Sequence, residues 1–225
     1  MAKCWKCGKH GLFLRVNDEG LCGDCAEAQK KIKAEAKKQL LKDPKYRKME
    51  EDLAYQDKLL KIALKARDRY KVDGDCDKAI AEYEKVMIQA KPPLKSNAHA
   101  MFLVDLYIKA GYNDNAWGYL NSLILSRGLD LDKNRKYQAK ILKKENKHDE
   151  AIKMLMLHHL AKSEWNNTFN REMFLKDIAP SIKKLGWSSS DAEALADMVG
   201  KQVGSKNYKE GVLIDKYKIF VKEHS

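Results

Sequence analysis

The chain has 225 residues, of which 44% are hydrophobic and 34% are charged, so its length suits one medium-sized domain or two small ones with a real core. Only four prolines and twelve glycines occur, which favours long helices and argues against a sandwich or barrel. No segment approaches the roughly 18 apolar residues of a membrane span, and no apolar signal region opens the chain. We therefore expect a cytoplasmic protein without a membrane segment.

The net charge of +12 is unevenly placed along the chain. Residues 26–71 carry 15 Lys or Arg against 8 Asp or Glu. Such a surplus attracts nucleic acid, acidic peptides or anionic lipid. The alternative is a lysine-rich helix surface that only keeps the protein soluble.

The N-terminal segment contains two C-x-x-C pairs, and fourteen residues separate the pairs. This spacing is one residue shorter than a common zinc pattern. Two tight turns aim four thiolates at one point, and four thiolates close a tetrahedral site that leaves no position for catalytic water. The pattern predicts one structural Zn²⁺ ion, with iron in a rubredoxin-like site as the alternative, and its ligands are Cys4, Cys7, Cys22 and Cys25.

The residues around the cysteines indicate a knuckle turn, a short hairpin and a helix. Gly8 follows the first pair, Leu12–Val16 is strand-like, Asn17–Gly20 is a turn, and a helix starts near Ala26. This order resembles a treble-clef zinc finger or short zinc ribbon, which we assign to residues 1–28. With four cysteines present, we expect His10 to be exposed rather than a ligand.

Two long helices are expected next. Residues 26–42 are rich in Ala, Lys, Glu and Gln, which are good helix formers. Pro44 is well placed to open a second helix, which extends to about Val72. Residues 29–59 form a basic helical linker in this interpretation, and pairing of these helices between two chains would give a dimer.

An internal repeat begins in the second helix. Three sets of residues share internal steps of four, five and four positions and recur after 37 and 35 residues. In each set an apolar residue ends one helix, Gly or Asn makes a left-handed turn, a small Ala admits the next helix, and a large residue follows one turn later. The sets are Tyr70, Gly74, Ala79, Tyr83; Tyr107, Gly111, Ala116, Leu120; and Leu142, Asn146, Ala151, Leu155.

Residues 73–86, the two prolines at 92 and 93, and Leu103–Tyr107 resemble the tetratricopeptide repeat (TPR). The resemblance implies a mostly α-helical protein in which residues 60–162 form three helical hairpins of a right-handed superhelix. An unrelated helical bundle is the alternative. Residues 163–225 are expected to supply a C-terminal helical cap or a small helical module, because terminal repeats need polar caps.

In stacked repeats of this family, the first helices line the concave groove that binds the partner. Lysines recur along one face of the first helix of the third hairpin. Further lysines lie on the first helices of the other two hairpins. The resemblance to repeats that clamp a C-terminal carboxylate is incomplete, since Asp68 and Asp105 lie where those clamps use asparagine. The predicted groove residues are Lys61, Lys65, Lys109, Lys133, Lys136, Lys140, Lys143 and Lys144.

The sequence contains no Gly-rich phosphate loop, nucleophile elbow or metalloprotease motif, so we do not expect an enzyme. The interpretation is a non-enzymatic adaptor that binds a protein or acidic peptide. The alternative is a zinc-finger protein that binds nucleic acid or has a regulatory role, with Trp5 and Phe13 as stacking rings. Few arginines lie in residues 26–71, which argues against sequence-specific base contacts.

Overall fold

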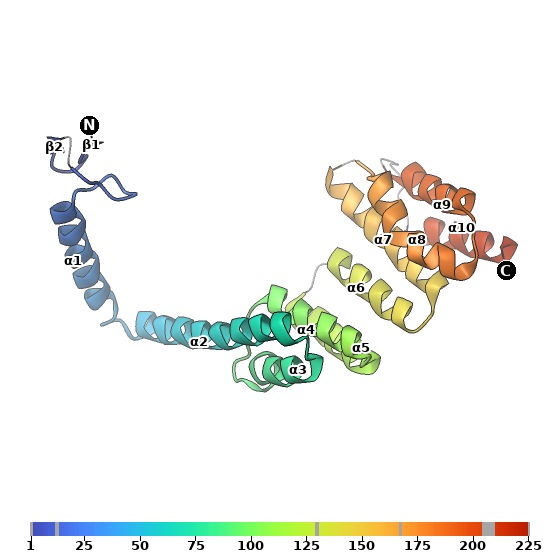
Figure 1. Cartoon of the computed structure of the whole chain (residues 1–225), viewed down its shortest axis with the longest axis horizontal. Coiled ribbons are helices and arrows are strands. Elements are labelled where there is room, and N and C mark those ends of the chain that lie inside the picture. Colours follow the sequence, from blue (N-terminus) through green and yellow to red (C-terminus); the bar gives the residue numbers. More distant parts are fainter. Residues whose placement is uncertain (1, 12–13, 129–130, 167, 204–209, 225) are drawn as a thin grey trace. The chain divides into compact units, whose positions relative to one another are not determined.

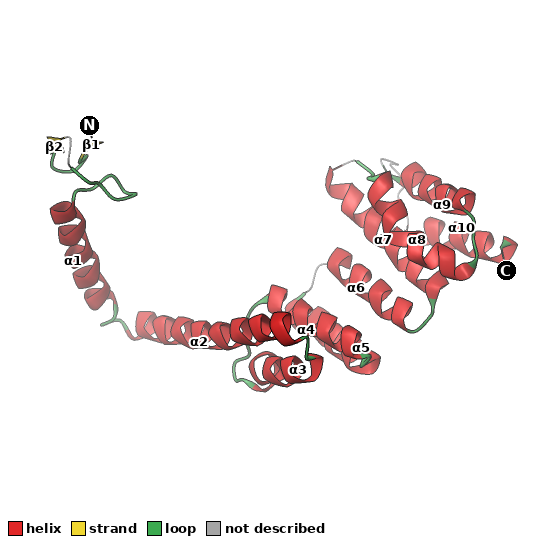
Figure 2. Cartoon of the chain, in the orientation of Figure 1, coloured by secondary structure: helices red, strands yellow, loops and turns green. Residues whose placement is uncertain are grey.

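The computed structural model describes residues 2–11, 14–128, 131–166, 168–203 and 210–224, without the side chains of residues 131–133 and 164–166. Within these residues the protein is mostly α-helical, with ten α-helices, one π-helical turn and one two-stranded sheet (Figures 1 and 2). The chain comprises two compact units, Met1–Lys61 and Ile62–Ser225.

The N-terminal unit begins with short strands and loops. Strand β1 (Ala2–Lys3) pairs antiparallel with β2 (His10–Gly11). An isolated antiparallel bridge joins Val16 to Cys22, and helix α1 (Gly23–Leu40) follows directly. Of the strand expected at Leu12–Val16, residues 12 and 13 lie outside the described residues.

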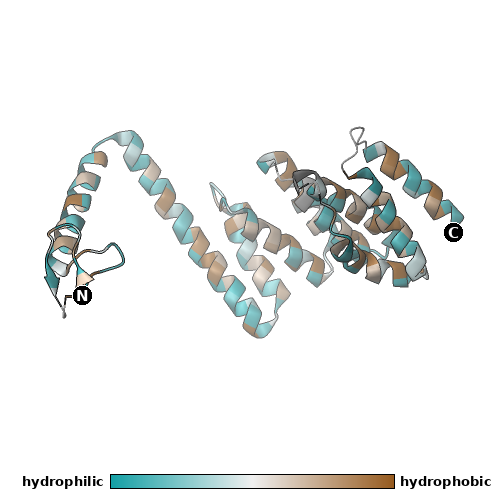
Figure 3. Ribbon diagram, turned by 90° about the horizontal axis from the view of Figure 1, so that it is seen from above, coloured by the Kyte–Doolittle hydropathy of each residue, from teal (hydrophilic) through white to brown (hydrophobic). Residues whose placement is uncertain are grey.

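Helices α1 and α2 (Pro44–Asp73) lie where the sequence predicts two long helices. Pro44 occupies the first position of α2, where its missing N–H is not needed. The Asp43 carboxylate accepts a hydrogen bond from the Lys45 N–H at 2.8 Å. No residue of α1 is buried, and hydrophilic residues separate its apolar ones (Figure 3). Propensity rather than packing therefore explains this helix.

The C-terminal unit contains the last part of α2 and all later helices. Its first half holds α3 (Cys76–Glu84), the π-helical turn η1 (Lys85–Gln89), α4 (Asn97–Ala110) and α5 (Asn113–Arg127). Its second half holds α6 (Leu131–Lys144), α7 (His148–Asn166), α8 (Arg171–Leu185), α9 (Ser189–Gln202) and α10 (Glu210–Glu223).

The repeat positions fall at three helix-to-helix turns. Gly74, Gly111 and Asn146 have φ angles of 69°, 83° and 59°, and each lies between two consecutive helices. At the second turn the Tyr112 N–H donates to the Tyr107 carbonyl at 2.9 Å. At the third, the Lys147 N–H donates to the Leu142 carbonyl at the same distance. These bonds satisfy helix C-terminal carbonyls that would otherwise lack donors.

Small residues follow each turn at the predicted places. Ala79, Ala116 and Ala151 are 3%, 0% and 0% exposed. Their lack of bulk lets the second helix of each hairpin approach its neighbours closely. The pairs α4 with α5 and α6 with α7 are in contact, and α3 packs against α4.

The C-terminal helices share one hydrophobic core with α6 and α7. Ile152 in α7, Phe174 in α8, Leu195 in α9 and Phe220 in α10 are all buried in it. The Tyr217 hydroxyl of α10 also donates to the Asp149 carbonyl at 2.7 Å. Helices α8, α9 and α10 therefore pack onto the third hairpin rather than forming a core of their own.

A capping box marks the start of α9. Ser188 accepts a hydrogen bond from the Asp191 N–H, and the Asp191 carboxylate accepts one from the Ser188 N–H. Pro180 lies inside α8, which continues to Leu185.

Across the described helices, none combines the length and apolar character needed to cross a membrane.

Candidate metal centre and the lysine surface

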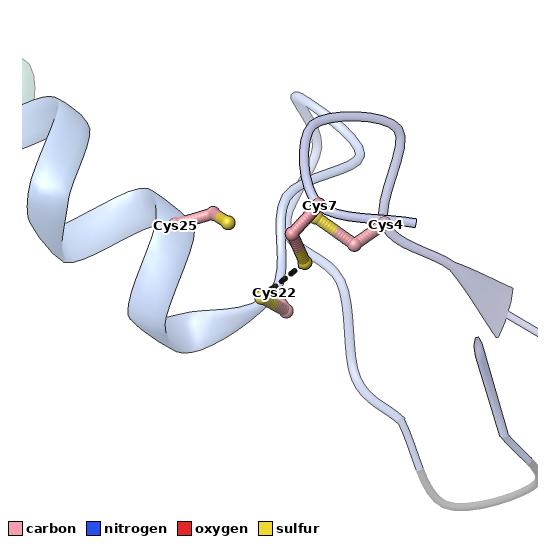
Figure 4. Close-up of side chains that lie close together, drawn as sticks. All are labelled: Cys4, Cys7, Cys22 and Cys25. Atoms are coloured by element: carbon pink, nitrogen blue, oxygen red, sulfur yellow. Dashed lines mark hydrogen bonds between the residues drawn. The ribbon is translucent and has the colours of Figure 1, made fainter. Parts of the chain in front are cut away.

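The four predicted ligands come together in the N-terminal unit (Figure 4). Cys4 and Cys7 lie on the first loop, Cys22 directly precedes α1, and Cys25 lies in its first turn. Their sulfur atoms all lie within 4.8 Å of one another, and none forms a disulfide. Cys4 and Cys22 are buried, Cys25 is half-buried and Cys7 is exposed.

The sulfur positions fit one tetrahedral ion. Zinc–sulfur bonds of about 2.3 Å place the corners of a tetrahedron roughly 3.8 Å apart. The Cys7 and Cys22 sulfurs are 3.7 Å apart. Since all four are thiols, the cluster can hold a metal that prefers sulfur, and it leaves no corner for water.

A tight turn orients the first cysteine pair. The Gly8 N–H donates to the Cys4 carbonyl at 2.9 Å, and the Cys4 N–H donates to the Lys9 carbonyl at 2.8 Å. Gly8 has a φ of 73°, which a residue with a Cβ rarely adopts. The turn thus depends on glycine immediately after Cys7.

A second turn orients Cys22. The Asn17 side chain accepts from the Leu21 N–H at 2.9 Å, and its backbone carbonyl accepts from the Gly20 N–H at 2.8 Å. Leu21 is 1% exposed and packs beside Cys4 and Cys22. Cys22 occupies the N-cap of α1, and its side chain makes no capping bond, which leaves the sulfur available for a metal.

Trp5 connects the two loops. Its indole N–H donates to the Glu19 carbonyl, and its backbone N–H donates to the Gly20 carbonyl at 3.3 Å. A Cβ on Gly20 would lie 2.8 Å from the ring, so only glycine fits below it. Trp5 as a whole residue is nevertheless 67% exposed. Phe13, the other predicted stacking residue, lies outside the described residues.

The thiols of the metal-free cluster differ in acidity. Hydrogen bonds from the backbone N–H groups of Cys22 and Cys7 lower the pKa of Cys4 to about 6. A hydrogen bond with Cys7, together with burial, raises the pKa of Cys25 to about 12. Four thiolates at this distance repel one another, so a divalent cation is the natural means of holding all four deprotonated.

Within the described part of the chain, the four cysteines are the one group with metal-site geometry. His10 lies in β2 and is exposed. Cys76, at the start of α3, donates a weak hydrogen bond to the Tyr70 hydroxyl at 3.8 Å and lies outside the cluster.

The predicted groove lysines lie on the helices expected to carry them. Lys61 and Lys65 lie in α2, although Lys61 belongs to the N-terminal unit and Lys65 to the C-terminal one. Lys109 lies in α4. The side chain of Lys133 lies outside the described residues. The remaining four, Lys136, Lys140, Lys143 and Lys144, lie in α6.

Lys140 connects α6 to α4. Its ammonium lies 2.7 Å from the Asp105 carboxylate and 4.2 Å from the centre of the Tyr137 ring. The Tyr137 hydroxyl donates to the other oxygen of Asp105 at 3.0 Å. Asp105 thus has a structural role, because it accepts hydrogen bonds from two residues of α6.

Two further lysines bond to neighbouring helices. Lys143 donates to the Asp177 carbonyl of α8 at 2.7 Å, and burial lowers its pKa. Lys109 donates to the Tyr70 hydroxyl of α2 at 3.1 Å, which raises its pKa. These ammonium groups already have acceptors inside the protein.

Lys65, Lys136 and Lys144 are different. They form no hydrogen bond or ion pair with other described residues, and Lys65 and Lys144 are exposed whereas Lys136 is half-buried. Sequence patterns could not separate these lysines from the bonded ones, because the acceptors lie on other helices.

The chain matches no protein-family model, no curated protein and no solved structure at a significant level. Arguments about its class therefore rest on its residues and their geometry.

Proposed function

We propose that this protein is a non-enzymatic adaptor in which a TPR-like array binds an acidic protein segment and a zinc finger forms the N-terminal unit. The recurrence of the hairpin carries the proposal. Three turns with left-handed Gly or Asn, each followed by a buried Ala at the same spacing, support a repeat array over an unrelated bundle. Repeat arrays commonly act through extended binding surfaces.

We further propose that the four cysteines hold one structural Zn²⁺ ion. The sulfur spacing and the lack of a fifth donor in the described cluster support a closed site. A unit of this size buries too little apolar surface to fold without help, so the ion would supply folding energy.

Metal analysis after dialysis tests the zinc proposal. The native chain should retain about one zinc per chain, and Cys22→Ser should retain far less, because a closed site loses one of its four thiolates. Cys76→Ser is the matched control, since Cys76 lies outside the cluster. Equal zinc content in both variants would contradict the assignment of ligands, and iron in the native protein would contradict zinc.

The proposed acidic partner follows from the lysines of the C-terminal unit that lack internal acceptors. Lys65, Lys136 and Lys144 offer ammonium groups to a carboxylate-rich segment at little structural cost. Lys109, Lys140 and Lys143 instead connect helices, so we assign them to the stability of the array. Of the predicted groove lysines, only those without an acceptor inside the protein therefore remain as proposed contacts to the partner.

Affinity capture from the native host followed by mass spectrometry tests this surface. The triple variant Lys65→Glu, Lys136→Glu, Lys144→Glu should lose the captured partner, because like charges replace attraction. The control variant Lys183→Glu, Lys184→Glu, Lys216→Glu makes the same charge change at exposed lysines of α8 and α10. Nuclease-resistant capture that survives the triple variant would show that the surface does not bind the partner.

A second candidate function is non-specific nucleic-acid binding by the N-terminal unit. The exposed Trp5 and the many lysines of α1, a helix with no buried residue, favour it. Copurified nucleic acid, seen as a raised absorbance ratio and removed by moderate salt, would support this function. Loss of that nucleic acid in Trp5→Ala would locate the contact at the finger.

A further inference from the structure

A cleft of about 610 Å³ has no role in the function proposed above, and Lys65, Lys136 and Lys144 are not among its lining residues. It is lined by residues of η1, of the segment that leads into α4, of the start of α4, and of α5. Met87 and Leu123 are buried and form an apolar floor. Its volume falls in the range of sites that bind small organic molecules.

The polar side of the cleft is basic. Lys95 and Arg127 line it, and none of the lining residues that the structure describes is acidic. Arg127 is the last residue of α5, and Gly128 ends that helix in the left-handed conformation. The Ser122 and Ser126 hydroxyls donate to carbonyls of α5, at 2.7 and 2.6 Å, so their oxygens face the cleft as acceptors rather than donors.

Two donors in the cleft wall lack partners. One guanidinium nitrogen of Arg127, Nη2, donates to the Leu94 carbonyl at 2.9 Å, whereas the other, Nη1, is buried with no hydrogen bond. The Tyr119 hydroxyl is also buried with no hydrogen bond. Burial raises the pKa of this phenol to about 12, so the hydroxyl keeps its proton. It can therefore donate a hydrogen bond to an acceptor that enters the cleft.

Unpaired buried donors are rare in native proteins and usually indicate an absent partner. Here two of them line one cleft, and one carries a positive charge. An anionic acceptor such as a carboxylate would pair with both donors, and it forms strong charge-assisted hydrogen bonds with a guanidinium. Both donor atoms are covered, so a ligand must shift a lining side chain to reach them.

We propose that this cleft binds a carboxylic acid that carries an apolar group. The carboxylate pairs with Arg127, Tyr119 and Lys95, and the apolar group lies on Met87 and Leu123. Either a free organic acid or the C-terminal residue of a peptide has this chemistry. The site uses the second helices of the hairpins, so it does not depend on the lysine surface.

Titration of the full ¹⁵N-labelled chain, followed by NMR, tests the proposal with three probes. They are 4-methylpentanoate, its neutral amide, and an acetylated tripeptide that ends in leucine with a free carboxylate. We expect saturable shifts at Tyr119 and Ser126 with one or both acids and none with the amide. Tighter binding of the peptide would identify a chain end as the ligand, and equal or tighter binding of the free acid would identify a small molecule.

Variants separate binding from folding. Arg127→Gln should weaken binding of the acid by about 10- to 100-fold, since a charged hydrogen bond is lost. Ser126→Leu fills the cleft from an exposed helix position and should abolish binding without removing a core residue. Lys216→Gln, on α10, is the charge control and should bind normally. Equal binding of acid and amide, or unchanged affinity in both cleft variants, would overturn the proposal.

Discussion

Asp177 accepts hydrogen bonds through two different groups. Its carboxylate accepts from Nε2 of His159 at 2.9 Å, and its backbone carbonyl accepts from Lys143 at 2.7 Å. The first bond joins α7 to α8 and the second joins α6 to α8. A single residue of α8 thus anchors both helices of the third hairpin.

His159 should make stability depend on pH. It is 2% exposed, and burial lowers its pKa despite the nearby Asp177, while His158 and Lys162 act in the same direction as burial. As pH falls below the ordinary value of about 6.5, the unfolded chain takes up a proton before the folded one does. The free energy of unfolding therefore decreases as the pH is lowered through this range.

Urea unfolding at pH 7 and pH 5 measures this effect, on protein treated with a chelator to remove metal. The midpoint should be lower at pH 5, and the difference should shrink in His159→Gln, which cannot titrate. A difference that His159→Gln leaves unchanged would assign the pH dependence to other groups, such as His99, whose pKa burial also lowers.

The identity and spacing of the four cysteines predicted that they would come together, because the two C-x-x-C turns set their geometry locally. The lysines show where this reasoning fails. Lys136 and Lys140 look equivalent on a helical face, yet only Lys140 meets an acid, Asp105, on a helix 35 residues earlier. Similarly, nothing local predicts that Arg127 and Tyr119 are left with unpaired donors.

At the scale of elements, backbone conformation at the turns matters more than side-chain space. Gly111 has a φ of 83°, and a Cβ there would meet nothing within 4 Å. Gly118 lies inside α5, also with nothing within 4 Å, but without a positive φ. The two glycines therefore form a matched pair for testing the turn.

Substituting alanine at each position should have opposite effects. Gly111→Ala should reduce the free energy of unfolding by about 1–2 kcal/mol, because L-residues are strained in this conformation. Gly118→Ala should increase it by roughly 0.5–1 kcal/mol, because it removes chain entropy from the unfolded state. Chemical denaturation measures both, and a stabilising Gly111→Ala would contradict the left-handed turn.

Most helices could be placed from the sequence because glycine, proline and capping residues mark their ends. The expected helix at residues 26–42 is observed at Gly23–Leu40, and the next is observed at Pro44–Asp73. The π-helical turn at Lys85–Gln89 was not predicted. Residues 85–89 also suit an α-helix, so their sequence does not distinguish the α from the π conformation. Packing against the rest of the protein decides between them.

At the scale of the whole molecule, the two units should respond differently to a chelator. The N-terminal unit has a small core of Cys4, Leu21 and Cys22, whereas the C-terminal unit has an extensive one. A chelator should unfold the finger and leave the helices of residues 62–225 intact. Circular dichroism at 222 nm should change little, while the NMR signals of residues 2–25 collapse.

Zinc readdition should restore those signals, and the Cys76→Ser control should behave as the native chain does. Global loss of helical signal on chelation would show instead that the metal supports the entire fold.

The sharing of one core by α6 through α10 also has a consequence for synthesis on the ribosome. Helices α3 to α5 contact one another, so they can bury apolar side chains such as Tyr83 against Phe102 as soon as they emerge. The third hairpin cannot, because a nascent chain that has reached only Val203 still lacks Leu213, Tyr217 and Phe220. During that interval α7 exposes apolar surface, which makes it the segment where a chaperone would bind during translation.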